Sequence, residues 1–201
     1  MKEQQKKYEL TGEFIEHWSG KKLYRIKALV SFGVVVAGQL GGFIESEKNL
    51  DQSLSGNAWV SGNAWVYGDA RVYGDARVYG DARVSGNAWV YGDAEVSGNA
   101  WVSGNAWVYG DARVYGDARV RSHAVISEHK MIFWASNVGS ENGTLTVFNG
   151  RDGLIVTRGC FTGTVDEFLA KSAEVHDDKT KNEYKLLIEV AKSRILGVKD
   201  E

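Results

Sequence analysis

Twelve consecutive six-residue units, from Leu54 to Val125, constrain the fold of this chain more than any other feature of its sequence. Within a unit, Ala and Val alternate with larger or polar residues, which is the period-two pattern of a short strand with one buried face. Gly followed by Asn or Asp then favours a bend, because these residue types tolerate positive φ. Each unit therefore predicts one short strand and one corner.

A single unit of this kind cannot bury its own Val and Ala. Three corners of roughly 120° would close a triangular coil of 18 residues, and coils stacked at about 4.8 Å would cover one another's apolar edges. The sequence thus predicts a mainly β protein, with a parallel β-helix of about four coils over residues 54–127. Val and Ala would fill a narrow interior that has no room for larger side chains.

The residues before the repeats predict a β-rich N-terminal cap over residues 1–53. Tyr8–Trp18 and Leu23–Val30 have strand-like composition on either side of a Ser-Gly turn. Val36–Gly41 resembles a degenerate repeat unit. A cap is required because an open β-helix end would expose apolar side chains and unpaired strand edges.

The residues after the repeats, 128–201, predict an α+β C-terminal cap. Three short apolar runs separated by Asn-Gly and Asp-Gly predict strands. Thr164 and Glu167 have the spacing of a capping box that begins a first helix. A second helix is predicted up to Leu196, where Gly197 would end it. The predicted elements are strands at 131–134, 144–148 and 154–157, and a second helix over 179–196.

The repeat unit Val-x-Gly-[Asn/Asp]-Ala-x resembles the hexapeptide repeat of left-handed parallel β-helices, a fold shared by many acyltransferases. Leu40-Gly-Gly-Phe-Ile-Glu45 before the repeats and Gly159-Cys-Phe-Thr-Gly-Thr164 after them are similar to segments of phage- and prophage-encoded hexapeptide-repeat proteins. The resemblance implies a left-handed coil and a phage setting. The spacing alone does not give the hand, since ordinary parallel crossovers are right-handed.

Composition excludes several classes of protein. A formal net charge of -2 does not indicate the strongly basic surface that binds duplex nucleic acid. The single cysteine excludes an internal disulfide and suits a reducing compartment. Residues 1–7 lack the apolar core of a signal peptide, and no run reaches membrane-spanning length. We therefore expect a cytoplasmic protein, of the host cell if phage-encoded, with no membrane partner.

The repeats are of two kinds that never mix: Ser-Gly-Asn-Ala-Trp occurs five times and Tyr-Gly-Asp-Ala-Arg six times, once with Glu95 in place of Arg. Duplication of these two kinds of unit during evolution is one explanation of why they never mix. The period of 18 also assigns the outward side chains to three faces, on which a change such as Trp59→Arg should be tolerated. The first face carries Trp59, Arg77, Glu95 and Arg113; the second Trp65, Arg83, Trp101 and Arg119; the third Arg71, Trp89 and Trp107 beside Tyr73, Tyr91 and Tyr109.

The faces suggest binding surfaces. Guanidinium groups on the indoles of the second face predict cation–π contacts of about 0.5–1 kcal/mol each. The aromatic third face predicts an interface in a homo-oligomer, a dimer or trimer, because monomers seldom leave such a patch in water. Mutual stacking without a partner is the alternative. The interface candidates are Tyr73, Tyr91, Tyr109, Trp89 and Trp107.

Catalytic signals are weak, and we assign no catalytic residue, metal ligand or cofactor. His123 could be the general base of a hexapeptide acyltransferase, but no loop interrupts the repeats, and an exposed residue at the end of the array is the plainer interpretation. Cys160 and His176 could form a nucleophile pair, against the plainer reading of a buried structural cysteine. A column of Asp75, Asp93 and Asp111 could hold a cation or be solvated turns.

The sequence favours a non-catalytic binding protein that sequesters a host component, first of all a nucleotide-type signal molecule. Arginine pairs with phosphate, and Trp and Tyr stack on bases. The alternatives are a structural or interaction protein, such as a virion component or a protein-blocking inhibitor, and an acyltransferase. The candidate ligand residues are Arg71, Arg77, Arg83, Arg113, Arg119, Trp89, Trp107 and Tyr91.

Overall fold

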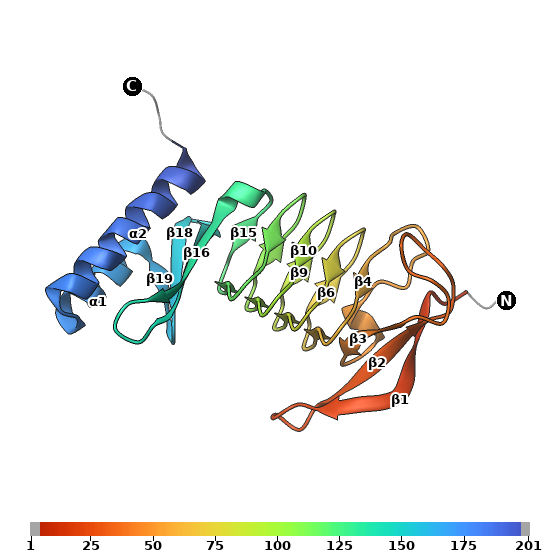
Figure 1. The fold of residues 1–201 in the computed structure, drawn as a ribbon. Coiled ribbons are helices and arrows are strands. Elements are labelled where there is room, and N and C mark those ends of the chain that lie inside the picture. The colour runs from red at the N-terminus through yellow and green to blue at the C-terminus, as the bar shows by residue number, and fades with distance from the viewer. Residues whose placement is uncertain (1–4, 198–201) are drawn as a thin grey trace.

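The computed structural model describes residues 5–197, which form an elongated molecule with three consecutive parts. A β-hairpin and loop lie at the N-terminal end, stacked coils form the middle, and a small sheet covered by two helices closes the C-terminal end (Figure 1). The coils therefore form the body of the molecule, and both of their open ends are covered.

The coils form a parallel β-helix with three sheets, one for each predicted outward face. Paired strands in successive coils are 18 residues apart, as Trp89 is from Trp107, so the predicted faces are confirmed. The first sheet contains β4 (Trp59–Val60), β7 (Arg77–Val78), β10 (Glu95–Val96) and β13 (Arg113–Val114); the second β5 (Trp65–Val66), β8 (Arg83–Val84), β11 (Trp101–Val102) and β14 (Arg119–Val120); the third β6 (Arg71–Val72), β9 (Trp89–Val90), β12 (Trp107–Val108) and β15 (Val125–Ile126).

The interior of the β-helix consists of the repeated Val and Ala side chains, which are fully buried from Ala58 to Ala124. Each corner from Gly62 onward has a left-handed residue close to the next coil: Gly86 has φ +67°, and a Cβ there would lie 2.9 Å from the Gly104 nitrogen. Ser122 keeps this conformation in the last unit, with φ 62°. The Gly at each corner thus serves both the turn and the close stacking.

The first coil begins earlier than the sequence predicts, so the β-helix has about five turns and not four. Strand β3 (Leu40–Ile44) pairs in parallel with β5, and Leu50 bridges Val72. The prediction that Leu54 starts the array is wrong, because Leu54 is 49% exposed while Leu50 is buried in the core. Ile44 pairs with Val66, 22 residues on, so this coil carries extra residues that hide its period.

A polar side chain completes that irregular coil. The short 3-10 turn η1 (Glu47–Asn49) interrupts it, and Asn49 is fully buried. Its Nδ2 donates to the carbonyl oxygens of Gly68 at 3.0 Å and Ala70 at 2.9 Å. The amide therefore occupies acceptors that a regular strand would have satisfied through its backbone.

The N-terminal hairpin, β1 (Tyr8–Glu16) and β2 (Lys22–Ala28), extends the second sheet through antiparallel pairing of β2 with β3. The predicted strands are confirmed. The loop that follows closes the open end of the coil, where Phe32 packs edge-on against Trp59 at 5.5 Å. The prediction of a degenerate repeat at Val36–Gly41 is wrong, because Val36 is exposed in this loop and its residues bond to one another and to β2.

A four-stranded antiparallel sheet covers the other end: β16 (Ile132–Val138), β17 (Gly143–Gly150), β18 (Gly153–Arg158) and β19 (Phe161–Thr164). Phe148 and Ile132 join the core of the coil. Thr146 accepts a hydrogen bond from the Arg119 nitrogen at 3.0 Å, and Thr157 donates to the Arg119 carbonyl at 2.6 Å. These bonds occupy backbone groups that would otherwise form an open edge.

Two helices cover the outer face of this end sheet (Figure 1): α1 (Val165–Val175) and α2 (Asp178–Leu196). The capping box is confirmed, because Thr164 Oγ1 accepts from the Glu167 nitrogen and Glu167 Oε2 accepts from the Thr164 nitrogen. Gly197, with φ 79°, is the C-cap of α2 as predicted. Tyr184 and Ile188 are buried between the helices and the sheet. Strand β19 has no counterpart among the predicted strands.

Candidate functional site

The first face is a ladder of alternating charge. Arg77, Glu95 and Arg113 are register neighbours on β7, β10 and β13. Arg113 Nε lies 4.0 Å from Glu95 Oε2, and the Tyr79 hydroxyl donates to the same oxygen at 3.1 Å. Trp59 heads this ladder but is only 5% exposed, because the N-terminal loop covers it. The expectation that Trp59→Arg is tolerated is therefore wrong.

The second face carries the predicted cation–π contacts. Arg83 lies over Trp65 with its guanidinium carbon 4.4 Å from the ring centroid, and 5.6 Å from that of Trp101. Arg119 lies 5.4 Å from the centroid of Trp101. The guanidinium planes of this face are thus already covered by indoles of the same chain, which leaves them less free to stack on a ligand.

The third face stacks its aromatic side chains on one another. Tyr91 lies between Tyr73 and Tyr109, with ring centroids 4.9 and 5.0 Å apart and nearly parallel planes. Trp89 and Trp107 stack at 5.9 Å, and Trp107 is still 43% exposed. The pKa of Tyr91 is raised above its usual value, chiefly by partial burial and secondly by the neighbouring Tyr109. Arg71 reaches the edge of this face, 5.7 Å from the Trp89 ring centroid.

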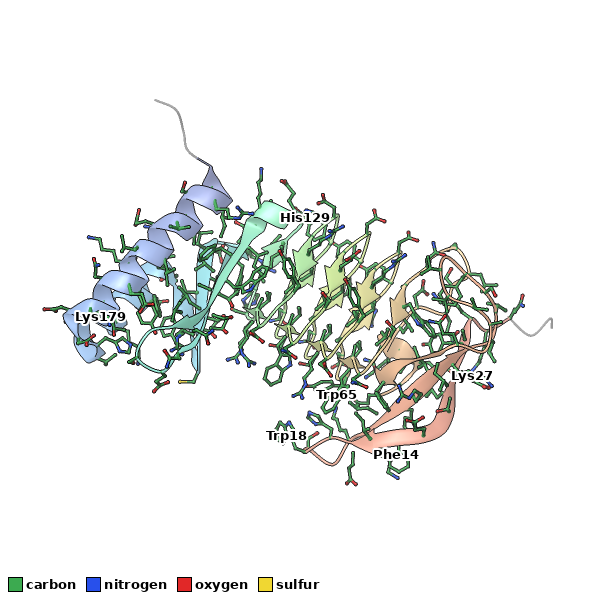
Figure 2. The ribbon with its side chains drawn as sticks, viewed as in Figure 1. Phe14, Trp18, Lys27, Trp65, His129 and Lys179 are labelled. Atoms are coloured by element: carbon green, nitrogen blue, oxygen red, sulfur yellow. The ribbon has the colours of Figure 1, made fainter. Side chains whose placement is uncertain are left out.

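A large hollow lies over the first face, at its C-terminal end, and has a volume of about 690 Å³. Its floor is the coil itself, and its walls come from the 3-10 turn η2 (His129–Met131), from β16 and from α2. His129 lies on the rim where the last coil meets the end sheet (Figure 2). The lining residues that carry charge or an aromatic ring are Tyr79, Glu95, Arg113, Tyr115, His129, Phe133, Trp134 and Arg194.

A second hollow of about 250 Å³ continues along the same face toward the N-terminal loop. Val34 and Val35 of that loop form one wall, and Arg77 lies on the floor. The two hollows share Tyr79 and Glu95. We call the two together the first-face groove. It runs along the coil from the N-terminal loop, residues 29–39, to the C-terminal module, which consists of β16–β19, α1 and α2.

The structure does not bring the sequence-predicted ligand residues together. Arg77 and Arg113 lie in the first-face groove, whereas the other candidates lie on the two other sheets. Arg83 and Arg119 belong to the second face. Those on the third face are Arg71, Trp89, Trp107 and Tyr91.

The groove also contains residues that sequence reasoning missed. Tyr79 and Tyr115 alternate with Ser in one 18-residue column, and Glu95 is the single exception among the Tyr-Gly-Asp-Ala-Arg units, so both signals were visible in the repeats. Trp134 packs edge-on against Tyr115 with centroids 4.4 Å apart. Trp134 and Arg194 come from the C-terminal module, and no local pattern shows that they meet the coil.

The residues considered for catalysis lie apart from this groove. His123 is exposed at a corner, with Nε2 3.3 Å from the Asn105 amide nitrogen. Cys160 is exposed in the turn between β18 and β19, so the prediction of a buried structural cysteine is wrong. Cys160 and His176 do line one small hollow of about 190 Å³ beside Tyr184.

The carboxylates at the corners remain spread along the coil. Asp75, Asp93 and Asp111 are exposed, and Asp75 accepts a hydrogen bond from the Asn57 amide at 2.6 Å. Between residues 5 and 197, no group of three or more His, Cys, Asp or Glu side chains is arranged to hold a metal ion. Neither α1 nor α2 is long and apolar enough to cross a membrane.

Comparison with known families addresses the repeats. A model of the YdcK β-solenoid repeat matches five overlapping or adjacent stretches of the coil, residues 64–78, 70–82, 76–92, 94–110 and 106–122. The chain is a β-solenoid repeat protein. The matched stretches stay within the regular coils of the solenoid and exclude both end modules. A search of curated proteins finds no match to this sequence.

Proposed function

We propose that this solenoid protein is a non-catalytic binding protein that sequesters a nucleotide-type anionic ligand. The observation that carries the proposal is the first-face groove, which combines guanidinium groups with aromatic rings in a hollow of about 690 Å³. That volume lies within the range of about 300–1,000 Å³ for small-molecule sites. Phosphate oxygens need charged donors, and a base needs a ring to stack on.

The positive charge of the groove supports an anionic ligand. Arg77, Arg113 and Arg194 line it, against the single carboxylate of Glu95. The Arg113 side chain is 56% exposed, so its guanidinium keeps donors available to a ligand. Arg113 also lies beside Tyr115 on the coil, which places a charged donor and a ring next to each other.

The biological part of the proposal comes from the flanking segments, Leu40–Glu45 and Gly159–Thr164, which resemble those of phage- and prophage-encoded proteins. In that setting, a binder of a nucleotide signal would act in the cytoplasm of the infected cell and remove an immune messenger without altering it.

Calorimetry with nucleoside diphosphates tests the proposal. We expect saturable binding that is lost in the Arg113→Glu, Arg194→Glu double variant, because two donors become two repelling carboxylates. The matched control is Arg71→Glu, the same change at the same repeat position on the third face. Its binding should equal that of the unaltered protein. If none of the nucleoside diphosphates binds, the proposal is contradicted.

The third face favours a second function, as an interaction protein, because Trp107 remains 43% exposed beside the stacked tyrosines. A photoreactive residue at position 91 should then cross-link to a protein in the producing cells, whereas the same residue at position 77 should not. Equal cross-linking at both positions would argue against a specific interface.

A further inference from the structure

One residue of the first-face groove breaks the repeat. Glu95 stands where the five other Tyr-Gly-Asp-Ala-x units have Arg, and it lies where the two hollows adjoin. We propose that Glu95 makes the groove selective for guanine, so that the ligand is a guanine nucleotide. This inference rests on the proposed function and names the base that the same site would select.

The carboxylate of Glu95 is held in place and retains a free acceptor. Both of its close contacts, from the Tyr79 hydroxyl at 3.1 Å and from Arg113 Nε at 4.0 Å, use Oε2. Oε1 makes no comparable contact with the described residues and therefore keeps its acceptor capacity. The side chain is 28% exposed, so a ligand in the groove can reach it.

Guanine is the base whose pairing edge fits a carboxylate. It presents two adjacent donors, N1–H and the N2 amino group. Oε1 of Glu95 can accept from one of them, and Oε2 has a second lone pair beside the Tyr79 hydrogen bond that can accept from the other. Adenine and cytosine each present one amino donor next to a ring nitrogen that accepts, and that acceptor would face a negative oxygen. Uracil presents a single donor between two carbonyl groups. Glu95 therefore favours guanine and disfavours the other bases.

The remaining groups of the groove suit the other parts of a nucleotide. Tyr115 and Trp134 meet edge-on with their ring centroids 4.4 Å apart, and Tyr115 is 50% exposed, so its ring can pack against a base. Arg113 on the coil and Arg194 on α2 line the same hollow from two sides and match the charge of a diphosphate. The site thus needs both the coil and the C-terminal module.

Glu95 also has a structural explanation that the test must separate from this one. With Arg at this position, three arginines would stack at one-coil spacing along the first sheet, since Arg77 and Arg113 are the register neighbours of Glu95. A residue kept only to relieve that repulsion would affect the stability of the coil and have no effect on base preference.

The experiment is calorimetry on the full chain with GDP, ADP and UDP. A correct bidentate base contact is worth roughly 1–3 kcal/mol, so GDP should bind about 5- to 150-fold more tightly than ADP or UDP. Glu95→Gln should bring GDP and ADP within about threefold of each other, chiefly by weakening GDP, because an amide offers only one acceptor. Glu9→Gln on the hairpin is the matched control and should leave the preference intact.

Each outcome decides between the readings. Binding of all three nucleotides with similar affinity, unchanged by Glu95→Gln, would overturn the guanine inference and leave the proposed function standing. Binding of none would overturn both. Circular dichroism tests whether the Glu95→Gln protein is folded, and Glu95→Ala, which removes the carboxylate without adding a charge, replaces it if it is not. Either variant that keeps the GDP preference of the unaltered protein contradicts the role of Glu95.

Discussion

The same chemical change, Trp to Arg, should have opposite consequences at two repeat positions that look alike in the sequence. Trp59 and Trp107 both end a Ser-Gly-Asn-Ala-Trp unit. Trp59 is 5% exposed beneath the N-terminal loop, whereas Trp107 is 43% exposed on the third face. Trp59→Arg therefore tests whether that loop is a packed cap, and Trp107→Arg is its internal control.

The magnitude follows from the buried area. A buried aromatic side chain removes roughly 150–250 Å² from water, which at about 25 cal/mol per Å² corresponds to roughly 4–6 kcal/mol. Arginine recovers part of this with its methylene stem but brings a charge beneath Phe32 and Tyr8, which pack edge-on against Trp59. We expect a loss of about 3–5 kcal/mol, the range found for large aromatic truncations.

The control should lose much less. Trp107 stacks on Trp89 at 5.9 Å, and an aromatic pair of this kind contributes about 0.5–1.5 kcal/mol beyond area burial. Because Trp107 is 43% exposed, less area is at stake, and the arginine stem covers part of it, so Trp107→Arg should cost roughly 1–2 kcal/mol. Arginine also replaces Trp at equivalent positions elsewhere in the coil, so the backbone tolerates the exchange.

Urea unfolding followed by circular dichroism measures both variants under identical conditions. A double-mutant cycle with Phe32→Ala adds a direct test, because Phe32 and Trp59 should show a coupling energy of about 0.5–1.5 kcal/mol. Equal destabilisation by the two Arg variants, or no coupling to Phe32, would refute the reasoning that the loop packs on the coil end.

Three further predictions address the faces and the titratable groups. The double change Tyr91→Glu with Trp107→Glu should convert a homo-oligomer into monomers, which light scattering would detect as a mass of 22.1 kDa. If the unaltered protein is already monomeric, or if the double variant assembles as before, this face is not the interface. Burial, and after it the charge of Arg83, lowers the pKa of His17. The unfolded chain therefore binds more protons than the folded one, and stability should fall as pH drops through 6.5. If a His17→Gln protein shows the same dependence of stability on pH, His17 is not the cause. His123→Ala and Cys160→Ala should each leave ligand binding unchanged in calorimetry, and loss of binding or of a catalytic activity in a folded variant would bring catalysis forward.

The regular part of the fold could be predicted because its information is local and repeated. A period of six with Gly and Asn or Asp at each corner leaves one way to bury Val and Ala, and the period of 18 fixes which outward residues stack. Helix starts were predictable for the same reason, since Thr164 and Glu167 satisfy the first turn within a few residues.

The irregular part depends on contacts between distant segments. The first coil uses Asn49 in place of a strand and carries extra residues, so its period does not appear in the sequence. The same limit applies to exposure: the repeat marks Trp59 as outward, and only the loop around Phe32 makes it buried.

The candidate site shows this limit most clearly. Arg77 and Arg113 were identified from the repeats, and the exceptional Glu95 was visible there. The groove exists because β16 and α2 stand beside the coil, bringing Trp134 and Arg194 to the first face. No pattern within either segment encodes that placement, which is set by how the end sheet packs on the last coil.

Native mass spectrometry of the protein purified without denaturation can detect a sequestered ligand without any assumption about its identity. If the protein sequesters a nucleotide, the spectrum should show a species heavier than 22.1 kDa by one bound nucleotide per groove, and heat should release the ligand intact. The Arg113→Glu, Arg194→Glu protein, purified in parallel, should carry none. A cleaved or acylated product in the released fraction would identify an enzyme. The ligand-free mass alone, together with no nucleotide binding in calorimetry, would contradict nucleotide sequestration.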